Sequence, residues 1–283
     1  MIGLHEIHKS FHQHAVEYDK YAKIQQEIGR RLFNRLDYIN IASGNILDLG
    51  CGTGQFSRAL RHKYPRANIV AIDFAQNMLI HSKKKHTWRH KWQLIAANMM
   101  QLPFNYESFD LVFANQVIHW SHALPDLFNE INRVMKNNGC FMFTTLGPDT
   151  FKEIQKAWQH DTNTYMHVNE FHDMHNIGDT LLKTKFIDPV MDMEILTARY
   201  KSIKDLHVSL KKQGVRNMHQ QRNSGLTGKT AYMSFIDKYN TMRIDNKYPL
   251  TYEVIYGQAW KSHRLMNQNN TEIRIPISNI KRS

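Results

Sequence analysis

The stretch that decides the fold is Asn45-Ile46-Leu47-Asp48-Leu49-Gly50-Cys51-Gly52-Thr53-Gly54. An apolar run typical of a β-strand ends in three alternating glycines, and a helical pattern follows over residues 55–64. Glycines at this spacing permit a tight turn from strand to helix and let the backbone approach a ligand closely. The stretch therefore predicts a ligand site at the carboxyl end of a strand.

The next strand-like run carries an acid at its tip. Residues 69–72 are apolar and are followed by Asp73, 25 residues after Asp48. A carboxylate in that position can accept two hydrogen bonds from the diol of a ribose. The dinucleotide fingerprint is Gly-x-Gly-x-x-Gly, whereas this turn reads Asp-x-Gly-x-Gly-x-Gly and holds no Lys or Arg for a pyrophosphate. The two segments predict a nucleoside cofactor that lies across the ends of two adjacent parallel strands.

Strand and helix patterns alternate along the middle of the chain. The expected strands are 46–49, 69–72, 92–96, 109–114 and 140–145, and the expected helices between them are 55–64, 75–85 and 125–136. A longer helix is expected before them, over 8–40. Alternation of this length predicts an α/β fold with a parallel sheet and helices on both faces.

The regular alternation of strand and helix patterns ends after residue 145. We expect helices over 149–159, 178–185, 202–212 and 227–240, an irregular polar segment over 160–175, and strands over 190–200 and 252–260. The predicted organisation is an N-terminal helical cap over 1–43 and a main domain over 44–262, with cap insertions around 149–185 and 202–245. A polar tail is expected over 263–283.

Composition limits the class of protein. No apolar stretch approaches the ~18 residues that a membrane span needs, and the first 15 residues hold no apolar core of the signal-peptide kind. The two cysteines, Cys51 and Cys140, suit a reducing cytoplasm better than a disulfide framework. The net charge is +12, and the residues from 201 onward hold 15 Lys and Arg against 5 Asp and Glu. This basic third of the chain indicates an acidic protein, an anionic membrane or nucleic acid as partner, unless it is only a solvated face.

Four stretches together resemble the class I S-adenosylmethionine-dependent methyltransferases. They are the glycine turn 50–54, Asp73-Phe74, Asn98-Met99-Met100-Gln101-Leu102-Pro103-Phe104 and the run 109–120. The resemblance implies a seven-stranded Rossmann-like sheet, mostly parallel with an antiparallel last strand. It also implies that S-adenosylmethionine is held by Asp48, Gly50, Cys51, Gly52, Gly54, Asp73, Phe74, Met78, Asn98, Met99 and Asn115. Asn98 stands where the family usually has an acid that accepts from the adenine amino group, and its side-chain oxygen can still accept.

Further motifs narrow the resemblance to carboxyl methyltransferases. These motifs are Tyr18-Asp19-x-Tyr21-Ala22 and the stretches 144–150, 167–175, 188–194 and 251–257. Their combination is similar to the bacterial malonyl-[acyl-carrier protein] O-methyltransferase family of biotin synthesis. The resemblance implies methyl transfer to the free carboxylate of a malonyl thioester, which gives S-adenosylhomocysteine and the methyl ester that starts pimelate synthesis. The residues that it places at the catalytic pocket are Tyr18, Tyr21, His119 and Trp120.

The chemistry of this reaction suits aromatic residues. A carboxylate with a pKa near ~4 is ionised at neutral pH, so no general base is needed. The reaction needs the carboxylate oxygen, the methyl carbon and the sulfur in line. Because carboxylate and sulfonium cancel their charges in the transition state, a dry aromatic pocket helps more than a strongly polar one.

An acidic acyl carrier protein would explain the basic third of the chain, because complementary charge steers docking. The expected contacts to substrate or carrier are Thr145, His167, Arg199, Lys204, Lys211, Lys212, Arg216 and Arg222. Arg199 is the candidate for the malonyl carboxylate. Nucleic acid fits less well, since the basic residues are dispersed and form no recognisable binding motif, and no membrane contact is expected.

Two alternatives stay open. Assembly factors of respiratory complex I share the pattern after the sheet and are thought to hydroxylate an arginine, and a third class would bind S-adenosylmethionine without catalysis. The histidine groups are His5, His8 and His12, and His167, His172 and His175 with Asp173. Neither clustering nor helical spacing guarantees that ligands converge on a metal, so no metal is expected.

Overall fold

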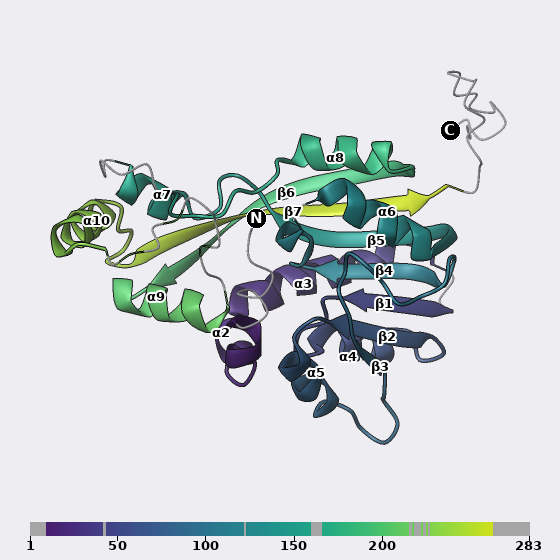
Figure 1. The fold of residues 1–283 in the computed structure, drawn as a ribbon. Helices are drawn as coiled ribbons and strands as arrows, with labels where there is room; N and C mark the ends of the chain where they lie inside the picture. Colours follow the sequence, from purple (N-terminus) through teal and green to yellow (C-terminus); the bar gives the residue numbers. More distant parts are fainter. Residues whose placement is uncertain are drawn as a thin grey trace, which may run out of the picture.

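A seven-stranded sheet runs through the centre of the molecule (Figure 1). The structure is a computed structural model that describes residues 10–41, 44–121, 123–159, 166–214, 217, 222, 225 and 227–262. The strands are β1 (Asn45–Leu49), β2 (Asn68–Asp73), β3 (Gln93–Ala96), β4 (Phe109–Asn115), β5 (Met135–Leu146), β6 (Phe186–Tyr200) and β7 (Tyr248–Lys261). Their order is β3-β2-β1-β4-β5-β7-β6, and β7 is antiparallel to both of its neighbours while the other pairs are parallel. The expected sheet, with its antiparallel last strand, is confirmed.

The register of the central strands brings the two predicted acids to one edge. Asp48 of β1 pairs with Ala71 of β2, and the next pair is Leu49 with Ile72, so β1 and β2 end side by side. These strands read as continuous apolar runs because helices cover both faces of the sheet. Ile46 and Leu47 are fully buried on opposite faces, in separate hydrophobic clusters.

Helices pack on both faces of this sheet. The helices are α2 (Tyr18–Tyr21), α3 (Lys23–Arg35), α4 (Gln55–Lys63), α5 (Gln76–Lys83), α6 (Leu124–Val134) and α8 (Met174–Lys183), with short 3-10 turns η1 (Leu36–Tyr38) and η2 (Ile118–Trp120). One cluster joins Ile28 of α3 and Leu60 of α4 to the sheet. The other cluster joins Ile131 of α6 and Leu181 of α8 to the opposite face.

Strands β6 and β7 reach past the rest of the sheet, and α7 (Lys152–Trp158), α9 (Ile203–Lys212) and α10 (Lys229–Thr241) gather at that end (Figure 1). The Trp158 ring stacks on Phe235 with centroids 4.7 Å apart. Buried Glu153 accepts a 2.9 Å hydrogen bond from the backbone nitrogen of Thr251. These contacts join α7 and α10 to each other and α7 to β7. The domain boundaries themselves stay predictions, and the tail 263–283 lies outside the described residues.

Several expected boundaries are wrong, including the starts of β6 and β7, which each lie four residues earlier than expected. The helix over 8–40 is broken: a turn covers residues 15–17, and Ala22 leaves the helical region with ψ 36° between α2 and α3. Strand β5 begins at Met135 and includes Asn138 with φ +60°, although residues 135–136 were expected to close a helix. A Cβ on Gly139 would lie 2.8 Å from the carbonyl oxygen of Lys136, so only glycine fits this irregular start. Helix α8 begins four residues early because the side chain of Asp173 accepts from the Asn176 nitrogen and caps it.

Candidate active site

The glycine turn after β1 has the conformation that its sequence predicts. Gly50, Gly52 and Gly54 have φ of +69°, +52° and +77°, in the left-handed region that favours glycine. A Cβ on Gly54 would lie 2.0 Å from the Ser82 hydroxyl, so this glycine is needed for packing. A Cβ on Gly52 would meet no atom within 4 Å. The turn is therefore open at Gly52, where a ligand can approach the backbone.

Two buried carboxylates flank this turn. Asp73 accepts from the backbone nitrogens of Gly52 (2.9 Å) and Ala75 (2.8 Å), and Asp48 accepts from the Ser57 hydroxyl (2.5 Å). Burial raises the pKa of Asp73 to about 6, although hydrogen bonds from the backbone oppose this shift. Burial also raises the pKa of Asp48 to about 7, and the negative charge of Asp73 adds to the shift. A ligand that brings a positive charge or hydroxyl donors would stabilise both carboxylates.

The N-terminal segment covers the same edge of the sheet. Phe11 lies edge-on to Phe74 and to Trp120, with centroids 6.2 Å and 5.5 Å away. Ala15 and Met78 belong to one small buried cluster that Tyr18 also contacts. Burial and the nearby charge of Asp73 raise the pKa of the Tyr18 phenol, so its hydroxyl keeps its proton. Aromatic side chains from the N-terminal segment thus lie over the ends of β2 and η2.

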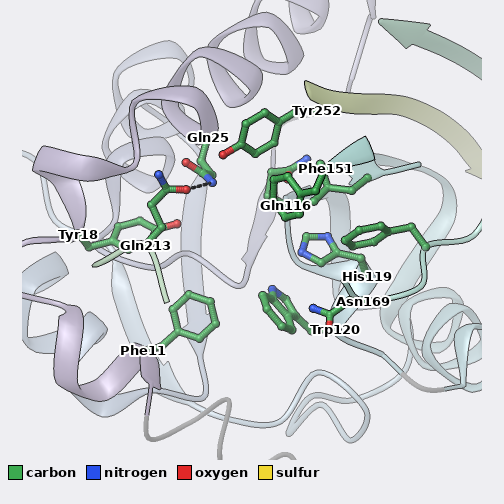
Figure 2. Close-up of a pocket in the computed structure, with 12 residues that line it drawn as sticks. Phe11, Tyr18, Gln25, Gln116, His119, Trp120, Phe151, Asn169, Gln213 and Tyr252 are labelled. Carbon is green, nitrogen blue, oxygen red and sulfur yellow. Dashed lines mark hydrogen bonds between the residues drawn. The ribbon is translucent and has the colours of Figure 1, made fainter. Parts of the chain in front are cut away.

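A cavity lies beneath this cover (Figure 2). Its lining combines aromatic rings with neutral polar side chains: Phe11, Tyr18, Gln25, Gln116, His119, Trp120, Leu146, Phe151, Asn169, Phe171, Gln213 and Tyr252. Within the part of the chain that the structure describes, no Lys, Arg, Asp or Glu lines it. The described lining is therefore uncharged and largely aromatic, as expected for a site where opposite charges cancel in the transition state.

Four buried polar atoms of this lining lack a hydrogen-bond partner among the described residues: Gln25 Oε1, Gln116 Nε2, His119 Nδ1 and the Tyr252 hydroxyl oxygen. Burial lowers the pKa of His119 to about 3, so the imidazole is neutral at any physiological pH. Buried polar groups are normally paired in proteins. Unpaired groups that line one cavity therefore indicate the place of a polar ligand.

The predicted catalytic residues divide into two sets. Tyr18, His119 and Trp120 line the cavity. Tyr21 is not in its described lining; its backbone oxygen accepts from Gln213 Nε2 at 3.1 Å, and its ring lies below the ammonium of Lys20. The role assigned to Tyr21 stays a prediction without support from its position.

The other residues of the predicted cofactor site lie at the ends of strands or on the loops that follow them. Asn98 is exposed and its Oδ1 accepts from the Met100 nitrogen at 2.9 Å, while Met99 packs against Trp120. Asn115 accepts from the Thr144 hydroxyl (2.8 Å) and donates to the backbone oxygen of Gln25 (3.2 Å), so it joins three elements. Cys51 follows Gly50 with its thiol protonated, because burial raises its pKa. Contacts of these residues to a cofactor stay predictions.

The predicted docking residues do not form one cluster. Thr145 is buried on β5 and lines a second, neighbouring cavity, and the His167 ring stacks on Trp158 with centroids 4.2 Å apart. Arg199 donates to Asp245 at 3.0 Å and is not in the described lining of the first cavity.

The remaining docking residues lie on α9 or follow it. Lys204 and Lys211 are exposed on α9, whereas Lys212 donates to Glu17. Arg222 is half-buried, and Arg216 lies outside the described residues. Of the eight predicted contacts, Lys204 and Lys211 are exposed on one helix, and their role in docking stays a prediction.

Sequence reasoning missed the amides of the cavity. Gln25 comes from α3, Gln116 follows β4, and Gln213 ends α9, so only the fold brings them together. Of these three glutamines, Gln116 alone lies in a stretch that the sequence motifs cover, the run 109–120.

The histidine groups of the sequence are the candidates for metal ligands. The described ranges hold no group of three His, Cys, Asp or Glu side chains that could bind an ion. His5 and His8 lie outside these ranges.

Comparison with known proteins decides the family. A model described as a methyltransferase domain matches residues 47–143. The malonyl-[acyl-carrier protein] O-methyltransferase of Legionella pneumophila is 55% identical over 276 residues, which is 97% of each chain. The protein of the same name from Gallionella capsiferriformans is 40% identical over 94% of this chain and 93% of its own. The chain belongs to the malonyl-[acyl-carrier protein] O-methyltransferase family. This membership confirms the resemblance and favours the methyltransferase over the hydroxylase-like and non-catalytic alternatives.

Solved structures agree on the fold. The YcgJ protein of Bacillus subtilis superposes with a TM-score of 0.59 at 13% identity, over 83% of this chain and all of its own. Phosphoethanolamine N-methyltransferase 2 of Haemonchus contortus, solved with S-adenosyl-L-methionine, gives 0.52 at 17% identity over 89% of this chain and 57% of its own. At such identities the likeness shows the fold alone. The described part of this O-methyltransferase has no helix that could span a membrane.

S-adenosylmethionine is the cofactor of this O-methyltransferase, and the residues present fit it. The open side of Gly52 leaves room beside the turn. Asp73 and Asp48 offer the acceptors that ribose hydroxyls and a methionine ammonium need, and no cation stands in the turn 50–54. The donor set thus suits a cationic nucleoside better than a phosphate.

Proposed function

We propose that this protein transfers the methyl group of S-adenosylmethionine to the free carboxylate of malonyl-[acyl-carrier protein], giving the malonyl methyl ester that starts pimelate and biotin synthesis. The observation that carries the proposal is the 55% identity that extends over 97% of the chain, cap and sheet included. Within this chain, the cavity at the end of β4 is the place where the acceptor would meet the cofactor.

The cofactor supplies an electrophilic methyl group on a sulfonium. In this proposal Asp73 accepts from its ribose hydroxyls, Asp48 answers its ammonium, and Phe74 and Met99 lie along its adenine. The glycine turn lets the backbone come close, which Gly52 supports with its open side. The cover formed by Phe11 and Tyr18 then excludes water from the reacting atoms.

The acceptor needs orientation rather than activation. Its carboxylate is ionised at neutral pH, so no residue has to remove a proton. The neutral state of His119 agrees with this, because a buried imidazole with a pKa of about 3 would be a poor base. Trp120 and Phe171 give the cavity apolar walls, which favour a transition state in which charge disappears.

We infer an acidic carrier protein as partner and the cytoplasm as location. Lys204 and Lys211 present exposed positive charge on α9, and Gln213 at the end of the same helix lines the cavity. Negative charge on the carrier would steer it to this helix. The thiols of Cys51 and Cys140 are both unpaired, which suits a reducing compartment.

Transfer of labelled methyl from S-adenosylmethionine to malonyl-carrier protein tests the proposal, with holo-carrier protein that lacks the malonyl group as the blank. A methyl ester on the malonyl group is the expected product. Cofactor binding without transfer to the malonyl protein would refute the assigned reaction while leaving the cofactor site intact.

A further inference from the structure

Two unpaired hydrogen-bonding groups lie close in sequence after β4. The Gln116 amide and the His119 imidazole both line the cavity, and Gln116 Nε2 and His119 Nδ1 have no partner among the described residues. Figure 2 shows them on the side of the cavity away from Gln213 and Phe11. Both belong to the segment at the carboxyl end of a central strand, where folds of this kind carry out their chemistry.

The backbone holds Gln116 in an unusual conformation. Its φ is +57°, in the left-handed region that residues other than glycine seldom adopt. The Gln116 nitrogen donates to the hydroxyl (2.9 Å) and to the carbonyl oxygen (3.2 Å) of Thr144, which keeps this conformation in place. Strained residues gather at functional sites, where the surrounding structure maintains them. The backbone at Gln116, from which the side chain extends, is thus fixed at the junction of β4 and β5.

Gln25 Oε1, another unpaired atom of the described lining, can only accept a hydrogen bond. Gln213 Nε2 donates to the Tyr21 backbone oxygen and to the Ser209 hydroxyl, so Gln213 Oε1 accepts from Gln25 Nε2 at 2.9 Å. This chain of bonds leaves Gln25 Oε1 as an acceptor. A carboxylate carries no donor for it. Among the unpaired buried atoms of the described lining, those that can donate to a carboxylate are Gln116 Nε2, His119 Nδ1 and the Tyr252 hydroxyl. The Tyr252 hydroxyl points toward Gln25 (Figure 2), so Gln116 and His119 are the pair that can meet a carboxylate on the other side.

We propose that the malonyl carboxylate is held by two neutral donors, the Gln116 amide N–H and the His119 Nδ1–H, and not by a basic side chain. This inference rests on the proposed reaction. As the oxygen–carbon bond forms and the carbon–sulfur bond breaks, the carboxylate loses its negative charge and the sulfonium becomes a neutral thioether. A Lys or Arg beside the carboxylate would stabilise the charged ground state more than the transition state and so slow the step. Neutral donors orient the oxygen at a smaller cost to the rate.

Substitutions that remove only the hydrogen bond test this assignment. Gln116→Met keeps the size of the side chain, and His119→Phe keeps a flat ring. Each is expected to raise the KM for the malonyl substrate roughly 10-fold or more, the loss typical of a hydrogen bond to a charged group, with unchanged affinity for S-adenosylmethionine. His119→Gln retains a neutral donor and is expected to recover most of the loss. Gln155→Met, the same change at an exposed position of α7, is the control.

A cationic variant tests the neutrality of the site. Gln116→Lys is expected to lower the KM for the malonyl substrate and to lower kcat about 10-fold or more, because it stabilises the ground state. Unchanged or higher kcat in this variant would overturn the inference, as would less than a twofold change of KM in both Gln116→Met and His119→Phe.

Direct binding separates this inference from the proposed reaction. Calorimetric titration of malonyl-coenzyme A into protein saturated with S-adenosylhomocysteine needs no turnover. Weaker binding in Gln116→Met and His119→Phe supports the two donors even if the natural protein methylates nothing, while equal binding in all variants overturns them. If either variant lost cofactor binding instead, its residue would belong to the cofactor site and the inference would fail.

Discussion

The carboxylate of Asp19 accepts a 2.5 Å hydrogen bond from the hydroxyl of Thr53, so helix α2 is joined directly to the glycine turn. Lys85 completes the contact, with its Nζ 2.8 Å from Asp19 and 3.0 Å from Thr53. The segment that covers the cavity is therefore fastened to the loop on which the cofactor is proposed to lie.

Asp19→Ala removes the hydrogen bond to Thr53 and the ion pair with Lys85. We expect affinity for S-adenosylmethionine to fall about 3- to 10-fold, since the hydrogen bond is charge-assisted but Asp19 is partly exposed to solvent. Isothermal titration calorimetry measures this change. Asp37→Ala breaks the surface pair with Lys63 and is the matched control; equal effects of the two changes would show that the contact with Thr53 has no special part.

Cofactor affinity should depend on pH through the two buried acids. The pKa values of about 7 for Asp48 and about 6 for Asp73 mean that both are largely protonated at pH 5.5 and ionised at pH 8. A cationic cofactor binds the ionised forms better, so its affinity is expected to rise from pH 5.5 to 8, by up to about 10-fold per pH unit for each group. Titrations at several pH values measure the slope, and Asp73→Ala is expected to abolish most binding. A flat profile would contradict the assignment of these acids.

The same shifts have the opposite consequence for the unliganded fold. Both folded-state pKa values lie above the ordinary value of 3.8, so the folded protein holds protons that the unfolded chain releases. The free energy of unfolding is therefore expected to fall as pH rises from about 4 to 7. Asp48→Asn keeps an acceptor for Ser57 and removes the charge, and at pH 8 it should stabilise the unliganded protein by on the order of 1–2 kcal/mol. Thermal unfolding at pH 5 and pH 8 tests this, because the stabilisation should shrink at the lower pH.

Local signals explain which parts of the fold could be predicted. The glycines at 50, 52 and 54 and the acid at 73 act through the backbone of their own strands, so their pattern alone indicates the turn and the cofactor edge. The start of β5 could not be predicted, because Asn138 adopts its φ of +60° only against the partner strand β4. Gln25 and Gln213 are 188 residues apart and meet only through the packing of the cap, so no spacing in the chain points to the polar part of the cavity.

Helix α9 carries both the lysines proposed to dock the carrier and a lysine that contacts the cover of the cavity. Lys204 and Lys211 are exposed on it, while Lys212 donates to Glu17 in the turn before α2. Reversal of both exposed charges, Lys204→Glu with Lys211→Glu, is expected to lower kcat/KM at least 10-fold with malonyl-carrier protein and less than 3-fold with malonyl-coenzyme A, because only the carrier reaches the surface of the helix. Lys183→Glu with Lys185→Glu, exposed lysines at the end of α8, is the control for net charge.

Lys212→Glu should behave differently from this pair. It places a second negative charge beside Glu17 and loosens the cover over the cavity, so both acceptors are expected to lose rate to a similar extent. Steady-state kinetics with the two acceptors at low and high salt separate the cases, since screening should weaken only the carrier-specific effect. If Lys204→Glu with Lys211→Glu slowed both acceptors equally, α9 would serve the cover of the cavity alone, and the carrier would have to dock elsewhere.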